Sequence, residues 1–463
     1  MRDLYIAAGG GGDPVGTLIA ARALTADGAG PADPPLIATY AWERPEVDPT
    51  ARPLGEGDFD GLAHEGGGIG GGGIGSGFGG GGFASFTPAA RARPPAGSTM
   101  PALARDLPAR LLLLDPARGL SSLARQISSM ARAAGGRIRV VDIGGDILTH
   151  GNEPGLCSPF GDALTLAACH LTGIPTTVHI AGPGLDGEIG ERPLLERLAG
   201  SHPLTPDPDA AAAAARALAW HPSEASALWA AAVHGARGTV RTVNSVVRLT
   251  DVSPRLYPLP LQEAIGHNPV ARALVDERPA TLDAAAGLSH RITGIPGLES
   301  ERTRTPRLDP PAGEIALLDR DEAMKTLREA ADGAHHITLR HAARSLGLTW
   351  TDIPALRALL TTDTPLLPLA SGPARRPRWR SVGHVLGAAR TLPTSTEGPR
   401  APGRGGVGGG GRGGGAPPPP RRPPPPRARP QRPPGPGGGR GGPVWGAAPT
   451  LPPPPGGPGA RGG

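Results

Sequence analysis

The sequence is short of cysteines, aromatic residues and long apolar runs, and each shortage excludes a class of protein. Its two cysteines, Cys157 and Cys169, have a spacing that fits neither a disulfide framework nor a thiolate metal site. Aromatic residues make up 3% of the 463 residues, so a core has to be built from Leu, Val, Ile and Ala. No apolar run is long enough to span a membrane, and no signal-peptide pattern follows Met1. We therefore expect a cytoplasmic protein with reduced thiols and no membrane partner.

Lysine is also nearly absent, whereas arginine, glycine and proline are abundant and unevenly distributed. Lys325 is the only lysine, and the 73 Gly and 58 Pro exceed a quarter of the chain, which indicates that part of it has no packed core. Beyond residue 374 lie fifteen Arg and one acid, Glu397, so the remainder carries a net charge of −8 against +6 for the whole chain. A mildly acidic body is not typical of nucleic-acid binding, so we do not expect a nucleic-acid partner for the folded part.

Three regions differ in composition and pattern. Residues 1–200 alternate strand and helix patterns, except that 64–83 (HEGGGIGGGGIGSGFGGGGF) carry too little apolar surface to fold and are expected to form a flexible insertion. Residues 201–372 predict helices and a β-hairpin, within GTVRTVNSVVRLTDVSPRLYPLP, that extend the same domain. Residues 373–463 are rich in Gly, Pro and Arg and are expected to be disordered. A reading-frame error in GC-rich DNA would also produce this mixture, and both interpretations of the tail stay open.

The alternation in residues 1–200 predicts an α/β fold. Strand patterns occur in DLYIAAGGGGD, PPLIATYAW, RLLLLDP, RIRVVDIGGDIL and PTTVHIAGPGLDGE, and helical patterns lie between most of them. In the helical pattern of residues 119–136, apolar side chains recur at spacings of three and four, at Leu120, Leu123, Ile127 and Met130. Strands and helices joined by short connections predict a mostly parallel sheet with helices on both faces.

Glycines and acids follow four of these strands, in AAGGGGD, LLLLDP, VVDIGGD and AGPGLDGE. Ligands of open parallel sheets bind beyond the carboxyl ends of the strands, and a glycine loop before a helix can hold an anion. A carboxylate beside a phosphate requires a cation such as Mg²⁺, or a ligand hydroxyl. We therefore predict a ligand site with Gly9, Gly10, Gly11, Gly12, Asp13, Asp115, Gly144 and Gly145. Asp142 and Asp146 are the predicted metal ligands, and Asp186 and Glu188 are the candidate catalytic acid or base.

Each of these loops also has a purely structural interpretation. Gly9 to Gly12 can form a tight turn with Asp13 capping the helix, the acids of DIGGD can pair within the sheet edge, and GPGLDGE can be a solvated turn. The first loop matches neither the G-x-G-x-x-G fingerprint nor a Walker A motif. His150 follows the DIGGD loop and is close enough in sequence to reach the same crevice, but the histidines have no zinc-site spacing.

An alternative function comes from residues 336–360, HITLRHAARSLGLTWTDIPALRALL. Two apolar-periodic helices around a turn at Gly347 have the outline of a helix-turn-helix, which predicts a ligand-responsive DNA-binding regulator. The second helix offers only Arg357 as a basic residue and has Asp352 near its start. A packing αα-hairpin is therefore the favoured interpretation.

Four motifs give the chain a family resemblance. YIAAGGGGD (Tyr5–Asp13), RVVDIGGDIL (Arg139–Leu148), AGPGLDGE (Ala181–Glu188) and HNPVARAL (His267–Leu274), in this order, resemble the prokaryotic family known as domain of unknown function 1152, over roughly residues 1–360. The resemblance implies a Rossmann-like α/β domain and no established activity. The strand-end loops, and not the resemblance, predict the function: a protein that binds a small phosphorylated or polyhydroxylated metabolite, with nucleotides among the candidates.

Overall fold

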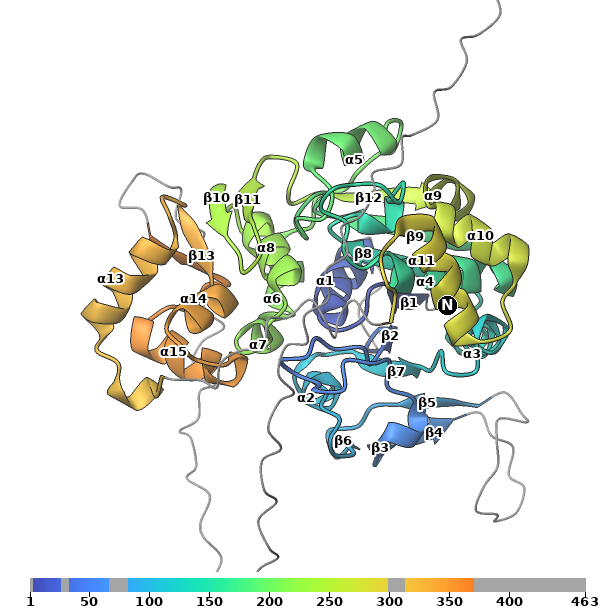
Figure 1. Ribbon diagram of the computed structural model, residues 1–463, viewed down its shortest axis with the longest axis horizontal. Coiled ribbons are helices and arrows are strands. Elements are labelled where there is room, and N and C mark those ends of the chain that lie inside the picture. The colour runs from blue at the N-terminus through green and yellow to red at the C-terminus, as the bar shows by residue number, and fades with distance from the viewer. Residues whose placement is uncertain (1–2, 26–32, 66–81, 299–312, 370–463) are drawn as a thin grey trace, which may run out of the picture. The chain divides into compact units, whose positions relative to one another are not determined.

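The fold is built around five parallel strands. The computed structural model describes residues 3–25, 33–65, 82–298 and 313–369. The five strands lie within an eight-stranded sheet of order β12-β9-β8-β1-β2-β7-β5-β4 (Figure 1). The parallel strands are β1 (Leu4–Ala7), β2 (Leu36–Tyr40), β7 (Arg110–Leu114), β8 (Ile138–Ile143) and β9 (Thr176–Ala181). Antiparallel pairing adds β12 (Leu256–Pro260) at one edge and β5 (Phe83–Ser85) and β4 (Ala63–Glu65) at the other. The predicted mostly parallel sheet is confirmed.

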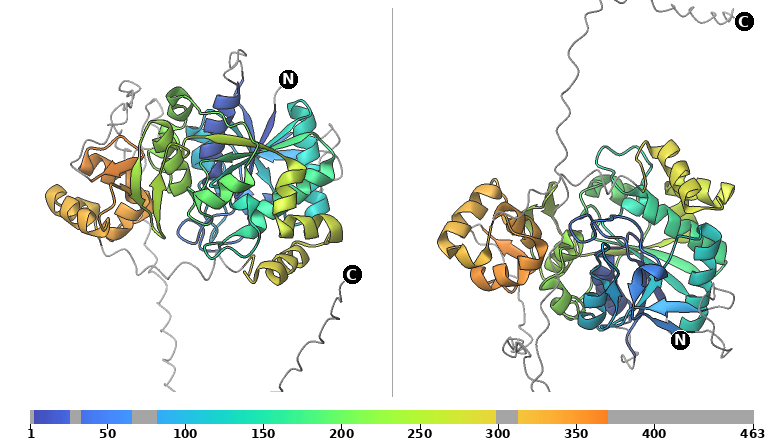
Figure 2. Two further views of the ribbon diagram at one scale, coloured as in Figure 1. Left: turned by 90° about the horizontal axis from the view of Figure 1, so that it is seen from above. Right: turned by 60° about the horizontal axis from the view of Figure 1, so that its bottom comes forward.

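Helices cover both faces of this sheet, because alternate side chains of each central strand point to opposite faces. Leu4 and Ile6 of β1 belong to one core, and Tyr5 and Ala7 belong to the other. The first core is completed by α3 (Leu120–Ala134), α4 (Pro159–Thr172), α9 (Leu261–His267), α10 (Pro269–Glu277) and α11 (Leu282–Thr293). The second is completed by α1 (Asp13–Thr25), α2 (Met100–Asp106), α6 (Pro208–Ala212), α7 (Ala215–Leu218) and α8 (Glu224–Val233). Figure 2 shows these layers from two further directions.

The predicted apolar stripe of α3 is buried in the first core, where Leu120, Leu123, Ile127 and Met130 are 0% exposed. At the edge of the same core, α5 (Glu191–Arg197) follows β9 and buries Leu194. Within the described ranges, no helix is both long and apolar enough to cross a membrane.

The order of the strands reverses between β1 and β8. The chain runs from β1 through α1 to β2 and then to β7, and α3 returns it across the sheet to β8, on the other side of β1. From β8, α4 leads outward to β9. At such a reversal the two neighbouring strands lead to helices on opposite faces of the sheet, and a crevice opens between the loops that follow them. Here the crevice lies between the loop after β1 and the loop after β8.

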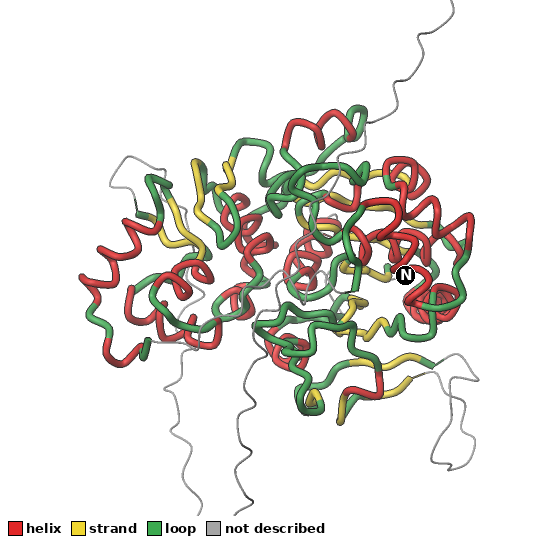
Figure 3. Tube along the Cα trace, in the orientation of Figure 1, coloured by secondary structure: helices red, strands yellow, loops and turns green. Residues whose placement is uncertain are grey.

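A second sheet, of order β11-β10-β13-β14, is built partly from the predicted hairpin. β10 (Gly238–Arg241) and β11 (Val246–Leu249) form that hairpin, whereas β12 leaves it and joins the main sheet. The other two strands, β13 (His336–Thr338) and β14 (Leu366–Pro368), belong to a segment with α13 (Arg320–Ala330), α14 (Leu339–Ser345) and α15 (Ile353–Leu360) (Figure 3). Segment 313–369 has a small core of its own around Leu327, Ala342 and Leu356.

Two predicted segments differ from the structure or lie outside it. The expected flexible insertion, 64–83, starts and ends in an antiparallel pair, with His64 opposite Ala84 and Glu65 opposite Phe83. These ends form strands because Phe83 and Ala84 bury their side chains; residues 66–81 lie outside the described residues. The expected disordered tail, 373–463, also lies outside them. A separate small sheet pairs β3 (Phe59–Asp60) with β6 (Arg91–Ala92).

Candidate functional site

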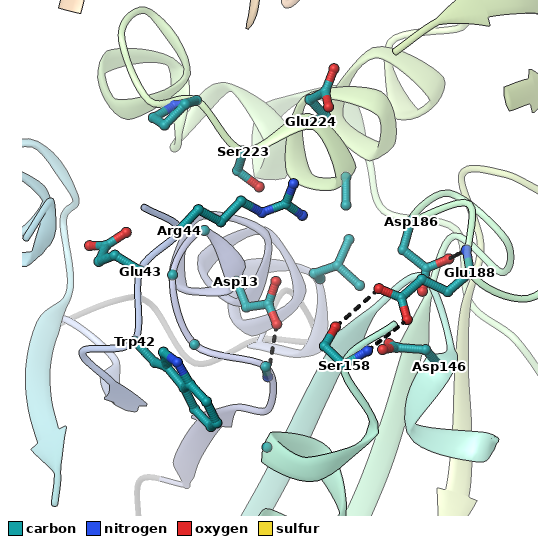
Figure 4. Close-up of a pocket in the computed structure, with 18 of the residues that line it drawn as sticks. Asp13, Trp42, Glu43, Arg44, Asp146, Ser158, Asp186, Glu188, Ser223 and Glu224 are labelled. Carbon is teal, nitrogen blue, oxygen red and sulfur yellow. Dashed lines mark hydrogen bonds between the residues drawn. The ribbon is translucent and has the colours of Figure 1, made fainter. Parts of the chain in front are cut away.

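A pocket of about 200 Å³ opens at the carboxyl edge of the main sheet, where the strand order reverses. Its walls come from the loops after β1, β2, β8 and β9, from the first turn of α4, and from the start of α8 (Figure 4). The sequence predicted that four strand-end loops meet at one site. The loops after β1, β8 and β9 line this pocket, and the loop after β7 does not. This place in the fold is the one at which sheets of this type bind their ligands.

The glycine loop after β1 lines the pocket and is closed by the acid that follows it. The Gly9 N–H donates to Oδ2 of Asp13 (2.9 Å), which begins α1. Gly12 has to be glycine because a Cβ there would lie 2.2 Å from Cβ of Ser223 on the opposite wall. Burial raises the pKa of Asp13 to about 7, although the charge of Arg44 opposes the shift. The Asp13 carboxyl therefore occupies part of the cradle that was predicted for a ligand anion.

Three buried carboxylates form a cluster beside this loop. Asp142 ends β8, Asp146 follows it in a short 3₁₀ turn (Asp146–Leu148), and Asp162 lies in the first turn of α4. Each offers an oxygen within 4.8 Å of the others, and the residues are 2%, 8% and 3% exposed, respectively. Among the described residues, Oδ2 of Asp142 and Oδ1 of Asp162 have no hydrogen-bond partner. Buried, unpartnered oxygens at this spacing are the donor set that a hard cation prefers.

Electrostatics makes this cluster unfavourable without a counter-charge. Burial is the largest cause that raises the pKa of Asp142, Asp146 and Asp162 well above the ordinary value, and repulsion from neighbouring carboxylates adds to it. Asp146 also lies within hydrogen-bonding reach of both Asp162 and Asp186. These carboxyls therefore keep their protons to a higher pH than ordinary carboxyls do, and a cation can displace those protons.

The two candidate acid–base residues have different environments. Glu188 accepts from Cys157 N–H (2.7 Å), Ser158 N–H (3.2 Å) and the Ser158 hydroxyl (3.0 Å), so it holds the two residues that lead into α4. Asp186 accepts from Glu188 N–H through Oδ1 (3.0 Å), and its buried Oδ2 has no partner among the described residues. Burial, with the charge of Glu188, raises the pKa of Asp186 to about 7. Asp186 is therefore the better placed of the two for proton transfer.

Gly144 and Gly145, predicted as ligand contacts, lie behind the pocket and do not line it. Gly144 has φ +129°, and a Cβ on it would be 2.3 Å from Cγ of Asp186. Gly145 donates a backbone hydrogen bond to the carboxylate of Asp142. These two glycines support the acids and allow their close approach.

Asp115 does not reach the pocket. It follows β7, which β2 separates from β1, and two strand spacings amount to roughly 10 Å. Its carboxylate accepts instead from the backbone N–H groups of Glu56 (3.0 Å) and Ala117 (2.9 Å). Glycines or acids at a strand end are therefore insufficient for a place in the pocket, because the strand also has to lie at the reversal or directly beside it. His150 is also outside the pocket and stacks on His267, with ring centroids 5.5 Å apart.

Several pocket residues carry no glycine-and-acid signal in the sequence. Trp42 and Arg44 follow β2, and Figure 4 shows Arg44 extending over Asp13. Asp162 had a usable signal, since it is an acid in an otherwise apolar, buried helix. Arg340 lies some 150 residues from the last predicted site residue, and nothing in the sequence points to it. Ser223 and Glu224, at the start of α8, also line the pocket and follow none of the predicted strand ends.

The predicted helix-turn-helix is present only in part. α14 and α15 flank a turn at Gly347, which has φ +70°, but residues 336–338 form β13 and are not helical. Those residues extend because they pair with β10 and β14. Arg357 donates through Nη1 to the carbonyl of Thr364 (2.9 Å), so the basic residue of the second helix is used within the segment.

Comparison with known proteins gives one family and no individual relative. The family model described as Protein of unknown function (DUF1152) matches residues 4–305, in agreement with the resemblance found in the motifs. The match ends before α13, so the resemblance extends less far than residue 360. No curated protein and no solved structure gives a significant match.

Proposed function

We propose that this chain, which belongs to the DUF1152 family, binds a small phosphorylated or polyhydroxylated metabolite together with a divalent cation at the carboxyl ends of its parallel strands. The observation that carries this proposal is the cluster of Asp142, Asp146 and Asp162. All three are buried, and two of them have an oxygen without a partner among the described residues.

The charge of the pocket supports a cation. Nine of the residues that line it are Asp or Glu, and two are Arg. Four of the acids accept hydrogen bonds from side-chain donors: Glu43 from Thr99, Glu188 from Ser158, Glu46 from Arg340 and Glu224 from Thr338. The other five are Asp13, Asp142, Asp146, Asp162 and Asp186, and a cation would offset their negative charge when they ionise. Mg²⁺ is bound by carboxylate oxygens together with water and ligand phosphates, so it fits this donor set.

A cation at this cluster would also determine the ligand class. A free phosphate would be repelled by the acids, whereas a metal-bound phosphate would be attracted. Acids that do not coordinate the cation can accept hydrogen bonds from ligand hydroxyls. Nucleotides and sugar phosphates carry both groups, and a pocket of about 200 Å³ suits a small molecule. In any proton transfer on such a ligand, Asp186 is the candidate acid or base.

A thermal-shift experiment on the full chain tests this proposal. The ligands are nucleotides, dinucleotides, sugar phosphates and polyols, each with and without Mg²⁺. A ligand that binds only the native state raises the melting temperature by mass action. We expect a Mg²⁺-dependent rise that is lost in Asp146→Asn. Asp115→Asn is the matched control, because it removes a strand-end acid that lies outside the pocket, and it should keep the full shift. Equal shifts in wild type and Asp146→Asn would contradict the proposal.

The DNA-binding regulator stays an alternative with less support. The pair α14 and α15 gives it an outline, but Arg357 is bound to a carbonyl of its own segment. A salt-dependent gel shift that is lost in Arg357→Ala would favour the regulator. Absence of DNA binding at low salt would exclude it.

A further inference from the structure

One of the two pocket arginines comes from outside the part of the chain that the family model matches. Arg340 lies on α14, whereas the match ends at residue 305. Its side chain is 9% exposed and lines the pocket together with Arg44, from the loop after β2. Segment 313–369 therefore supplies a buried positive charge to a pocket whose acids lie in the family domain.

Two carboxylates hold Arg340 without using all of its donors. Nε and Nη2 donate to Oε2 of Glu46, at 3.1 and 2.6 Å. Nη1 is 3.8 Å from Oε2 of Glu224, which is an ion pair but longer than a hydrogen bond. A guanidinium has five N–H groups in a planar fork. The Nη1 edge of Arg340 is thus the part that can still donate to a ligand oxygen.

The segment is fixed in this position by contacts to the same two acids. The Trp350 indole N–H donates to the backbone carbonyl of Glu46 (3.0 Å), and the Thr338 hydroxyl donates to the Glu224 carboxylate. β13 also pairs with β10 of the family domain. Arg340 is therefore held in place before any ligand arrives, as a preorganised binding group has to be.

We propose that Arg340 is a specificity-determining residue that binds an anionic group of the ligand, so that binding requires segment 313–369. The inference rests on the proposed function. A cation at the Asp cluster would bind one phosphate group of the ligand, and Arg340 together with Arg44 would bind the neighbouring phosphate group. Guanidinium groups bind phosphate oxygens through paired hydrogen bonds. The ligand class is thereby narrowed to molecules with two linked phosphates, such as a nucleoside diphosphate, and neutral polyols are excluded.

Calorimetric titration of pyrophosphate into the Mg²⁺-saturated full chain tests this inference. We expect Arg340→Gln to weaken pyrophosphate binding by roughly tenfold or more, as for the loss of a charged hydrogen bond. Arg344→Gln is the matched control: Arg344 lies on the same helix, 4.0 Å from Glu46, and does not line the pocket. Its affinity should stay within about twofold of wild type. An unchanged affinity in folded Arg340→Gln would overturn the inference.

Two further variants keep the test interpretable if Arg340→Gln is unstable. Arg340→Lys retains the charge but not the fork, so it should bind with an intermediate affinity. The double variant Glu46→Gln, Arg340→Gln removes both charges of the pair and should fold while still binding pyrophosphate weakly. If wild-type protein binds Mg²⁺ but no pyrophosphate, the role of Arg340 is overturned and the proposed cation site is not. Wild-type protein that binds no Mg²⁺ would overturn the proposed function as well.

Discussion

Protonation of the pocket acids is the residue-scale property that sets the charge of the pocket. Desolvation raises the pKa values of Asp13 and Asp186 to about 7, and burial with mutual repulsion raises the pKa values of Asp142, Asp146 and Asp162 well above the ordinary value. An acid with a raised pKa stays protonated in the native state at a pH at which it is ionised in the unfolded chain. Its contribution to native stability is therefore lost progressively as the pH rises toward the native pKa.

Asp13→Asn isolates this effect for a single group. From pH 5 to pH 8, without metal, wild type should lose about 2 to 3 kcal/mol of stability relative to the variant, because one pKa unit corresponds to about 1.4 kcal/mol. Comparing the two proteins cancels the opposite contribution of the buried histidines His179 and His221, whose pKa values are lowered by burial. Urea unfolding at several pH values measures the difference. A difference that does not change with pH would contradict the raised pKa.

Asp162→Asn should separate stability from binding. Replacing one carboxyl by a neutral amide removes repulsion between the acids. The free energy of unfolding of the metal-free variant should therefore exceed that of metal-free wild type by roughly 1 to 2 kcal/mol, and its melting temperature should be higher. The same change removes a cation ligand, so added Mg²⁺ should no longer stabilise it. Melting curves with EDTA and with Mg²⁺ check both expectations. A variant that is less stable without metal and still responds to Mg²⁺ would count against the cluster as a cation site.

At the scale of elements, the N-terminus of α4 is held by an acid from another part of the chain. Ser158 makes no side-chain cap of its own. Glu188, from the loop after β9, instead accepts the backbone N–H groups of Cys157 and Ser158, the two residues that precede the helix. This contact fixes α4, and with it Asp162, against the strand ends. Glu188 thereby positions the pocket even though its oxygens are already engaged.

Glu188→Ala should therefore cost stability, by about 2 kcal/mol, since it removes the acceptor of two part-buried backbone N–H groups and one hydroxyl. Ser158→Ala is the control, because it removes one hydroxyl contact and keeps both backbone contacts. We expect a smaller loss for it in denaturant unfolding. Equal losses in the two variants would show that the hydroxyl contact is the important one.

Element patterns could be predicted from the sequence where the signal is local. The central strands are apolar runs and α3 has a clear stripe, so their existence follows from periodicity. The pairing of β12 with β9 and the extension of residues 336–338 depend on partners far away in the chain. For the same reason, the sequence placed Asp142 and Asp146 together in the site, but it could not show that Asp162 belongs to the site or that Asp115 does not. Both facts depend on where α4 and β7 lie relative to the reversal in strand order.

At the scale of the whole molecule, the pocket unites residues from both sides of the family boundary. The acids come from residues 4–305, and Arg340 comes from segment 313–369, which has its own core and shares a sheet with β10 and β11. This arrangement is the basis of the proposed ligand, which a cation would hold at one end and the guanidinium of Arg340 at the other.

Binding of Mn²⁺ to the full chain, followed by the EPR signal of the free ion, is the most direct test of the central claim. We predict saturable binding to wild type that weakens as the pH falls, because the cation has to displace protons from acids whose pKa values are raised. Asp142→Asn should abolish it, and Asp115→Asn should leave it unchanged. A free-ion signal that wild type does not reduce, or reduces no more than Asp142→Asn does, would contradict the account.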